Sequence, residues 1–378
     1  MMHAGATLLL FTVYIVVGLA AGSLGPAIPG FAEATGETAG RIGMLFIFYR
    51  IGYISGSLGG GRVIDAWGAG RLTSWLAFLI AASLSLLSFA ANLPLLFAAI
   101  LLLGLGLGAT EVSSQTNLIR LHGERVGPCM NGLHLMYCVG AIIAPLLVAF
   151  FYSRRDLPTA FRLIALAAAL VAFAALRRRG EAGIAEKSET VFAKAPVSMI
   201  AFLAAGLLFT GAAESSLAGW LYSYALAETG AGERFAGILT SSFWLTMTVG
   251  RLAGVWLVRK AGAFRLLLWS SGAAVFSMAG LLVSGSLPSL WITIVLAGLF
   301  EASVVPLVFT FAGEKKIASG PIVGFFVVAC SCGGMVFPPL LGAFMQRHGF
   351  GLFAPGIAVL QLAAFLAFAA VFFMRKKF

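Results

Sequence analysis

The sequence predicts an all-α membrane protein with 12 transmembrane helices, arranged as two pseudo-symmetric six-helix bundles. Of its 378 residues, 60% are hydrophobic and only 10% are charged, and the mean hydropathy is +1.00. A water-soluble globule of this length does not have such a composition. Lipid accepts only helices or closed barrels, and the long apolar runs lack the alternating segments of a barrel strand. One polar connection and an internal repeat divide the runs into two halves.

Twelve apolar runs are long enough to cross a bilayer, which takes about 20 residues of helix. In the first half they begin near residues 7, 40, 72, 94, 128 and 159. In the second half they begin near residues 196, 235, 264, 289, 318 and 351. The first run is too long for the apolar region of a signal peptide and lacks a clear cleavage pattern, so we interpret it as the first span.

The long polar connection has the sequence RRRGEAGIAEKSETVFAKA and covers residues 177–195. It separates six predicted helices from six others. We therefore predict an N-terminal bundle at 1–177, a cytoplasmic linker at 178–195 and a C-terminal bundle at 196–378.

The basic residues predict the orientation, because cytoplasmic loops carry an excess of Lys and Arg. With a cytoplasmic N-terminus, outside loops hold only Arg41, Arg154, Arg155, Arg162, Arg234 and Arg347. The inside loops, linker and tail then hold Arg62, Arg71, Arg120, Arg125, Arg177, Arg178, Arg179, Lys187, Lys194, Arg259, Lys260, Arg265, Lys315, Lys316, Arg375, Lys376 and Lys377. Both termini are thus predicted to be cytoplasmic. The formal charge of +11 follows from this sorting and does not indicate a nucleic-acid partner.

The two halves match at a single offset of 194 residues, which indicates duplication of a six-span unit in one topology. Shared Leu-Pro and Arg positions argue against chance matching of glycines. The matched pairs are Gly56 with Gly250, Gly68 with Gly262, Arg71 with Arg265, Leu93-Pro94 with Leu287-Pro288, Gly104 with Gly298, Gly140 with Gly334, and Pro145 with Pro339.

The loop after the second span reads GRVIDAWGAGR, from Gly61 to Arg71. Its glycines allow close helix approach, and an acid between basic residues can form a charge latch at the cytoplasmic mouth. This loop resembles the signature of the major facilitator superfamily, although Ala66 replaces the usual basic residue. The equivalent loop of the second half has Arg259 in place of the acid. The predicted cytoplasmic gate consists of Gly61, Asp65, Gly68, Arg71 and Arg251.

Five stretches resemble the fucose-permease-like and glucose-transporter-like branch of that superfamily. They are FYRIGYISGSL, GLGLGATEVSSQTNLI, NGLHLMYCVGAIIAPLL, GAAESSLAGWLYSY and FWLTMTVGRLAG. The resemblance implies the major facilitator fold, a midplane site between the two halves and alternating access by rocking. It also implies a functional carboxylate at Glu111. The first span has no ionisable side chain around Gly22, where that branch often carries a carboxylate.

Ionisable side chains inside the spans are the candidates for a site. Each costs roughly 2.5 to 3.5 kcal/mol at mid-bilayer, so each must face protein or water. They are Arg50, Glu111, His134, Glu214, Arg251 and Glu301. Gln115 lies one turn from Glu111 on the same helix face. Instead of a functional role, Glu111 could serve as a static partner for Arg50. Arg251 could likewise have a structural role in place of a role in the gate.

Glu214 precedes Trp220, Tyr222 and Tyr224 in the seventh span. A carboxylate near aromatic rings suits a polyhydroxylated solute, and it also suits a cationic amphiphile. The alternative places these rings in an interfacial aromatic belt.

Asn131, His134 and Tyr137 recur at helical spacing, so they can share one face of the fifth span. His134 can titrate or donate one interhelical hydrogen bond. Glu301 precedes Pro306, and Pro338-Pro339 are predicted to interrupt the eleventh helix, as happens beside a cavity. The predicted pathway residues are Glu111, Gln115, Arg50, Asn131, His134, Tyr137, Glu214, Trp220, Trp244 and Glu301.

These features predict a secondary active transporter for a small polar, sugar-like solute in the inner membrane, without covalent chemistry. The alternative is a drug or metabolite efflux antiporter of the same fold, and a membrane receptor or intramembrane enzyme is more distant. The sequence lacks the phosphate-loop, H-E-x-x-H and G-x-S-x-G motifs. We expect no metal or cofactor, a proton as coupling ion with sodium as the alternative, a monomer, and four cysteines that only pack.

Overall fold

The computed structural model describes residues 4–67, 69–122, 126–177, 196–315, 317 and 320–374, with the side chains of 60–70, 127–128, 320–321 and 373–374 left out. Helices account for all the regular structure in these ranges. Ten helices of this described part are long and apolar enough to cross a membrane, and a shorter apolar helix covers Arg71–Leu87. The predicted all-α membrane class is therefore confirmed. The contacts divide the chain into two compact units, Met1–Lys187 and Ser188–Phe378, and the predicted linker at 178–195 lies outside the described residues.

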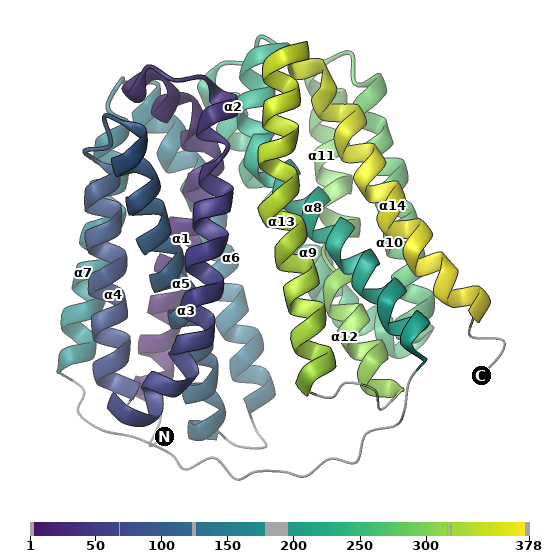
Figure 1. Cartoon of the computed structure of the whole chain (residues 1–378), viewed down its shortest axis with the longest axis horizontal. Helices are drawn as coiled ribbons and strands as arrows, with labels where there is room; N and C mark the ends of the chain where they lie inside the picture. Colours follow the sequence, from purple (N-terminus) through teal and green to yellow (C-terminus); the bar gives the residue numbers. More distant parts are fainter. Residues whose placement is uncertain are drawn as a thin grey trace. The chain divides into compact units, whose positions relative to one another are not determined.

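Helices of the first unit run alongside one another (Figure 1). α3 packs along α5, α1 along α6, and α4 along α7. The helix starts lie within a few residues of those predicted, because each apolar run is bounded by polar or turn-forming residues. The helices are α1 (Ala4–Thr35), α2 (Ala39–Ile42), α3 (Leu45–Trp67), α4 (Ala69–Leu87), α5 (Leu93–His122), α6 (Val126–Tyr152) and α7 (Leu157–Leu176).

The second unit repeats these pairings. α9 packs along α11, α8 along α13, and α10 along α14. α8 also packs against α14. The elements are α8 (Val197–Glu228), α9 (Glu233–Ala261), α10 (Ala263–Ala279), η2 (Gly280–Val283), α11 (Leu287–Glu301), α12 (Val304–Glu314), α13 (Gly320–His348), η3 (Phe350–Leu352) and α14 (Phe353–Met374).

Two helices differ from the prediction in continuity. The tenth predicted helix is broken between Glu301 and Val304 into α11 and α12. Pro306 has no backbone N–H, so it cannot complete the helical hydrogen bond to the Ala302 carbonyl. The predicted interruption at Pro338-Pro339 is wrong, because α13 continues through both prolines. Neighbouring helices re-satisfy the backbone groups that proline frees.

Glycines bring helix backbones into contact at equivalent places in the two units. A Cβ atom on Gly56 would lie 2.1 Å from the carbonyl oxygen of Leu105, and one on Gly250 would lie 2.3 Å from that of Leu299. Both the glycine and the carbonyl residue of the first contact lie 194 residues before their counterparts in the second. The same offset relates the contact of Gly104 with the Tyr49 carbonyl to that of Gly298 with the Phe243 carbonyl. The duplication inferred from sequence thus preserved helix-to-helix contacts as well as residue types.

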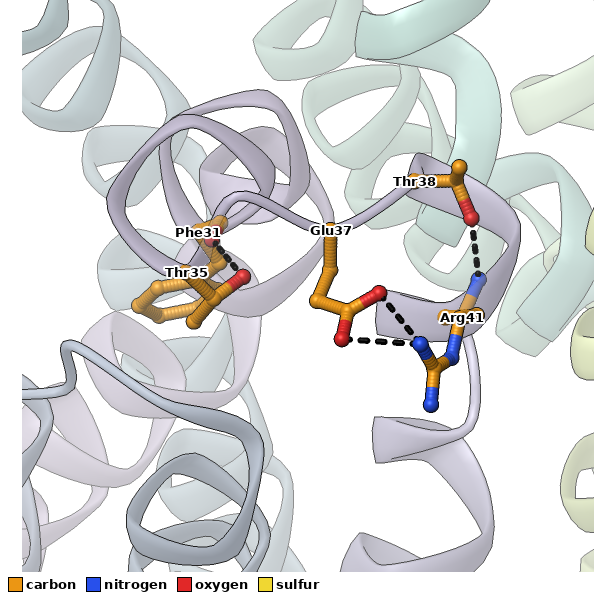
Figure 2. A network of polar contacts seen from close by, with 5 residues as sticks. All are labelled: Phe31, Thr35, Glu37, Thr38 and Arg41. Atoms are coloured by element: carbon orange, nitrogen blue, oxygen red, sulfur yellow. Dashed lines mark hydrogen bonds and ion pairs between the residues drawn. The ribbon is translucent and has the colours of Figure 1, made fainter.

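The turn between α1 and α2 is ordered by its own polar side chains (Figure 2). The Thr38 hydroxyl accepts a hydrogen bond from the Arg41 backbone N–H at 3.4 Å, which caps the start of α2. The Arg41 guanidinium forms an ion pair with Glu37 at 2.6 Å. An exposed pair of this kind contributes about 0 to 1 kcal/mol. The pair therefore orders the turn locally, and helix packing supplies the stability.

We expect Gly56→Ala to lower the stability of the purified protein by about 1 to 3 kcal/mol, because the added methyl group meets a backbone oxygen that cannot move aside. Gly59→Ala is the matched control in the same helix, since a Cβ there would meet no atom of the described residues within 4 Å. That change should raise the stability by up to about 1 kcal/mol. Thermal unfolding in detergent measures both, and equal shifts for the two variants would contradict the close contact.

Candidate functional site

A polar cluster surrounds Glu111 in the first unit. Glu111 and Gln115 lie one turn apart on α5, and the Gln115 amide donates to one carboxylate oxygen of Glu111 at 3.3 Å. The Tyr53 hydroxyl, from α3, donates a hydrogen bond to the other carboxylate oxygen. Hydrogen bonds to an ionised acceptor are the stronger class. The carboxylate is therefore held by donors from two helices.

Tyr14 adds the third helix, α1, to this site. Its hydroxyl donates to the backbone carbonyl of Glu111 at 3.3 Å and accepts from the Gln115 amide at 3.5 Å. Tyr14 is buried, whereas Tyr53, Glu111 and Gln115 are half-buried. We call these four residues the Glu111 cluster. Its polar atoms are hydrogen-bonded to one another across three helices.

Arg50 brings a positive charge to the edge of the Glu111 cluster. Its guanidinium carbon lies 5.9 Å from the ring centre of Tyr49 and 5.8 Å from that of Tyr53, within the range of cation–π attraction. Arg50 and Glu111 both act electrostatically on Tyr49. The structure thus brings the predicted residues Arg50, Glu111 and Gln115 together.

The α6 residues of the predicted pathway lie at the margin of this cluster. The His134 ring meets the Tyr14 ring edge-on, with 6.0 Å between their centres. Asn131 and His134 are exposed, and Tyr137 is half-buried. His134 therefore contacts the cluster from α6.

A second polar site lies in the other unit. Glu301, the last residue of α11, is 1% exposed, and Gln361 of α14 is fully buried. The Glu301 carboxylate lies close to the Gln361 amide and within electrostatic range of Glu214 on α8. We call Glu214, Glu301 and Gln361 the Glu301 cluster. The predicted residues Glu214 and Glu301 therefore lie in the same unit, within electrostatic range of each other.

Trp220 is fully buried, so the alternative that places it in an interfacial belt is wrong, and its place in the predicted pathway stays a prediction. The indole N–H donates to the carbonyl of Pro338 at 2.8 Å. A Cβ atom on Gly342 would lie 2.3 Å from the ring. The belt interpretation fails because the indole fills the space beside the proline pair of α13.

The other predicted aromatic residues also pack within their unit. Tyr222 is fully buried, and Tyr224 is 8% exposed, with its ring stacked 4.5 Å from that of Phe353. The belt interpretation is therefore wrong for both tyrosines. Trp244 is half-buried and meets Phe243 edge-on at 5.5 Å.

The predicted cytoplasmic gate falls mostly outside the described part of the chain. Gly61, Asp65 and Gly68 lie outside the residues whose side chains are described. Arg71 is exposed near the start of α4, and Arg251 is half-buried within α9. The Arg251 Nε atom is buried without a hydrogen-bond partner among the described residues. The gate stays a prediction.

Sequence reasoning missed three residues of these clusters, Tyr14, Tyr53 and Gln361. All three are uncharged, and a search for ionisable side chains in apolar runs passes over them. Gln361 could have been found as an amide within the run AVLQLAAF, because an amide in hydrocarbon also needs partners.

The chemistry of both clusters is binding and exchange rather than bond cleavage. Carboxylate, amide and phenol groups donate and accept hydrogen bonds, and the carboxylates can take up a cation. The described residues contain no group of three or more His, Cys, Asp or Glu side chains that could hold a metal ion.

Comparison with known proteins gives one family and one fold. The sequence profile of the Major Facilitator Superfamily matches residues 10–320. The mouse protein named sodium-dependent glucose transporter 1A is 21% identical, with 90% of this chain and 89% of the relative covered. An uncharacterized transporter of Sinorhizobium fredii is 25% identical, with 92% and 95% covered.

Two solved structures have the same fold. The nucleoside transporter NupG, in a mutant form, matches with a TM-score of 0.80 at 15% identity, covering 97% of this chain and 99% of its own. A bacterial homolog of the human lysosomal transporter Spinster also matches with a TM-score of 0.80, at 13% identity, covering 99% and 97%.

We expect Trp220→Phe to destabilise the protein by about 1 kcal/mol or more, because the Pro338 carbonyl loses a buried donor and the smaller ring leaves a gap beside Gly342. Trp291→Phe is the control. The Trp291 indole donates to the Ser242 hydroxyl at 2.9 Å, but its side chain is 44% exposed and leaves no internal gap. Thermal unfolding should show a larger loss for Trp220→Phe, and the reverse order would contradict the packing role.

Proposed function

Because the chain belongs to the Major Facilitator Superfamily, we propose that it is a secondary active transporter that moves a small, polar, sugar-like solute by alternating access. Members of this family are membrane transporters and not enzymes. The observation that supports the solute class is the Glu111 cluster, in which hydrogen bonds join a carboxylate, an amide and phenols from three helices.

A polyhydroxylated solute matches this set of groups. The Glu111 carboxylate can accept hydrogen bonds from solute hydroxyls, and the Gln115 amide offers both a donor and an acceptor. The rings of Tyr49 and Tyr53 can pack against the C–H faces of a sugar. The names of the mouse relative and of NupG add support, since glucose and nucleosides both carry hydroxylated rings.

Glu111 is also the proposed carrier of a coupling proton. Its carboxylate accepts hydrogen bonds from Tyr53 and Gln115, and Arg50 lies near the same tyrosines. A solute that displaced one of these partners would change the balance between the charged and neutral carboxyl. Proton and solute occupancy would then be linked. Sodium, which the name of the mouse relative carries, is the alternative ion.

The proposal includes the membrane arrangement predicted from the sequence. It comprises 12 spans, in two bundles at 1–177 and 196–378 joined by the linker, with both termini in the cytoplasm and the protein a monomer in the inner membrane. The ten long apolar helices support the multi-pass part of this arrangement.

Glu111→Gln should abolish accumulation of solute driven by a pH gradient, because the amide cannot carry the proton, while exchange of solute across the membrane continues. Proteoliposomes loaded with a panel of sugars, nucleosides and amphiphilic dyes measure both activities. Glu314→Gln, at an exposed acid, is the control and should accumulate solute like the unmodified protein.

Unchanged accumulation by Glu111→Gln would reject Glu111 as the proton carrier. Movement of dyes without movement of sugars or nucleosides would instead favour the efflux alternative.

Tyr53→Phe should lower kcat/KM for the transported solute by about 10- to 100-fold, the effect of losing a hydrogen bond of about 1.5 to 3 kcal/mol to a charged group. Tyr152→Phe is the matched control, because Tyr152 donates to the exposed Glu33 at 2.6 Å outside the Glu111 cluster. Equal losses in the two variants would show that the Tyr53 hydroxyl has no special role. Initial uptake rates at a series of solute concentrations provide the comparison.

A further inference from the structure

The exposed face of α10 begins with a basic residue and continues with aromatic ones. Arg265 and Trp269 are exposed one turn apart on this face, and Trp269 and Phe276 are 65% and 82% exposed. The segment Ala263–Val283 is long and apolar enough to cross a membrane, so the side chains exposed along it contact lipid. Tryptophan favours the boundary between hydrocarbon and headgroups. Arg265, one turn nearer the helix start, therefore lies at the level of the lipid headgroups.

The end of α9 carries the same kind of pair in the reverse order. The Lys260 ammonium group lies 3.8 Å from the centre of the Trp256 ring, which is within the range of cation–π attraction. Trp256 is 57% exposed, and Leu252, one turn further from the helix end, is 59% exposed. An exposed apolar stripe thus ends at a tryptophan and then a basic residue on this helix too. The contact with the ring holds the ammonium group close to the helix.

A tight turn connects the two pairs. Gly262 is the single residue between α9 and α10, and its φ of +78° is a left-handed conformation that glycine adopts without strain. The Gly262 N–H donates to the Val258 carbonyl at 2.9 Å, which closes the turn. Basic residues on both sides of the turn are therefore near one another in sequence. We call the following residues the basic hairpin: Trp256, Arg259, Lys260, Arg265 and Trp269.

The positive charge of the basic hairpin is not offset by acids of its own helices. Arg259 is exposed next to Lys260, and the sequence contains no Asp or Glu at 234–300. The neighbouring helix α12 packs against α10. It contributes one acid and one base at its end, Glu314 and Lys315, whose charges offset each other. The basic hairpin therefore presents unneutralised positive charge at the membrane surface.

The first unit has only part of this arrangement. Arg71 and Trp75 of α4 lie 194 residues before the basic and aromatic residues of α10. Both are exposed, Trp75 by 59%. The counterparts of the two basic residues of α9, however, are Asp65 and Ala66. The second unit therefore combines three basic residues with two exposed tryptophans and no acid, whereas the first unit has an acid in the corresponding segment.

We propose that the basic hairpin binds the phosphate headgroup of an anionic phospholipid. Its tryptophans place it at the bilayer surface, and basic clusters at that level attract anionic headgroups. Arginine also matches phosphate oxygens with two donors in a fixed geometry. A soluble acidic partner would leave the exposed apolar stripes uncovered, whereas the acyl chains of a lipid cover them. In the orientation proposed above, the hairpin faces the cytoplasmic leaflet.

The experiment uses the purified full-length protein in nonionic detergent, without any solute. Phosphatidylglycerol and phosphatidylcholine with the same acyl chains are added separately, and native mass spectrometry measures how much of each lipid stays bound. Thermal unfolding is followed in parallel, because a ligand of the folded state raises its stability. The hairpin variant combines Lys260→Gln with Arg265→Gln. The matched control combines Arg234→Gln with Arg347→Gln, which removes two exposed charges from the same unit outside the hairpin.

We expect phosphatidylglycerol to bind about tenfold or more tightly than phosphatidylcholine, and to raise the melting temperature further. Each basic residue at a membrane surface contributes about a fivefold factor in affinity. The hairpin variant should therefore lose most of the preference for phosphatidylglycerol, and the control variant should keep it. Raising the ionic strength from about 0.1 M to about 1 M should also reduce the preference, since the screening length falls from about 10 Å to about 3 Å.

Equal binding of the two lipids by the unmodified protein would overturn the proposal. An unchanged preference in the hairpin variant would do the same, as would an equal loss in the control variant. A failure to transport sugars would leave the lipid result standing, because no solute is present. Conversely, solute uptake by a protein without a lipid preference would retain the proposed function and remove the lipid site.

Discussion

Hydrocarbon contains no hydrogen-bond partners, and this absence constrains every polar group within the membrane-spanning helices. Each such group must be satisfied by another part of the protein or by a ligand. The Glu111 carboxylate meets this requirement through the Tyr53 hydroxyl and the Gln115 amide, and the carbonyl of Pro338 meets it through the Trp220 indole. The Glu301 carboxylate is buried beside the Gln361 amide of α14.

Backbone contact at glycines makes this arrangement possible. Tyr53 reaches Glu111 because α3 and α5 approach closely enough for a carbonyl of one helix to touch a glycine of the other, as at Gly56 and Gly104. In the second unit, the contact at Gly250 lies next to the break after Glu301. Small residues at helix interfaces thus place the polar side chains as well as pack the helices.

Much of this structure could be predicted from the sequence. Apolar runs indicated the helix positions, because run length and flanking residues determine where a helix can cross a membrane. Glu111 and Gln115 could be found because a charge in such a run is conspicuous and helical spacing puts an amide on its face.

Side-chain environments were harder to predict. The partners of Glu301 come from α8 and α14, which are distant in sequence, and no local pattern links Gln361 to Glu214. The same holds for Trp220, whose burial depends on Gly342 of another helix. A single proline broke the tenth helix whereas two left α13 continuous, since the outcome depends on what neighbouring helices offer to the freed backbone groups.

The 194-residue correspondence holds for glycine contacts but not for the acids. The position equivalent to Glu111 in the second unit is Val305, and the position equivalent to Glu301 in the first is Leu107. The two units therefore share a scaffold of glycine contacts but carry different polar side chains. A doubled scaffold of this kind lets one copy change its ligand without endangering the folding of the other, which is one route by which a small set of shared architectures comes to serve many different cargoes.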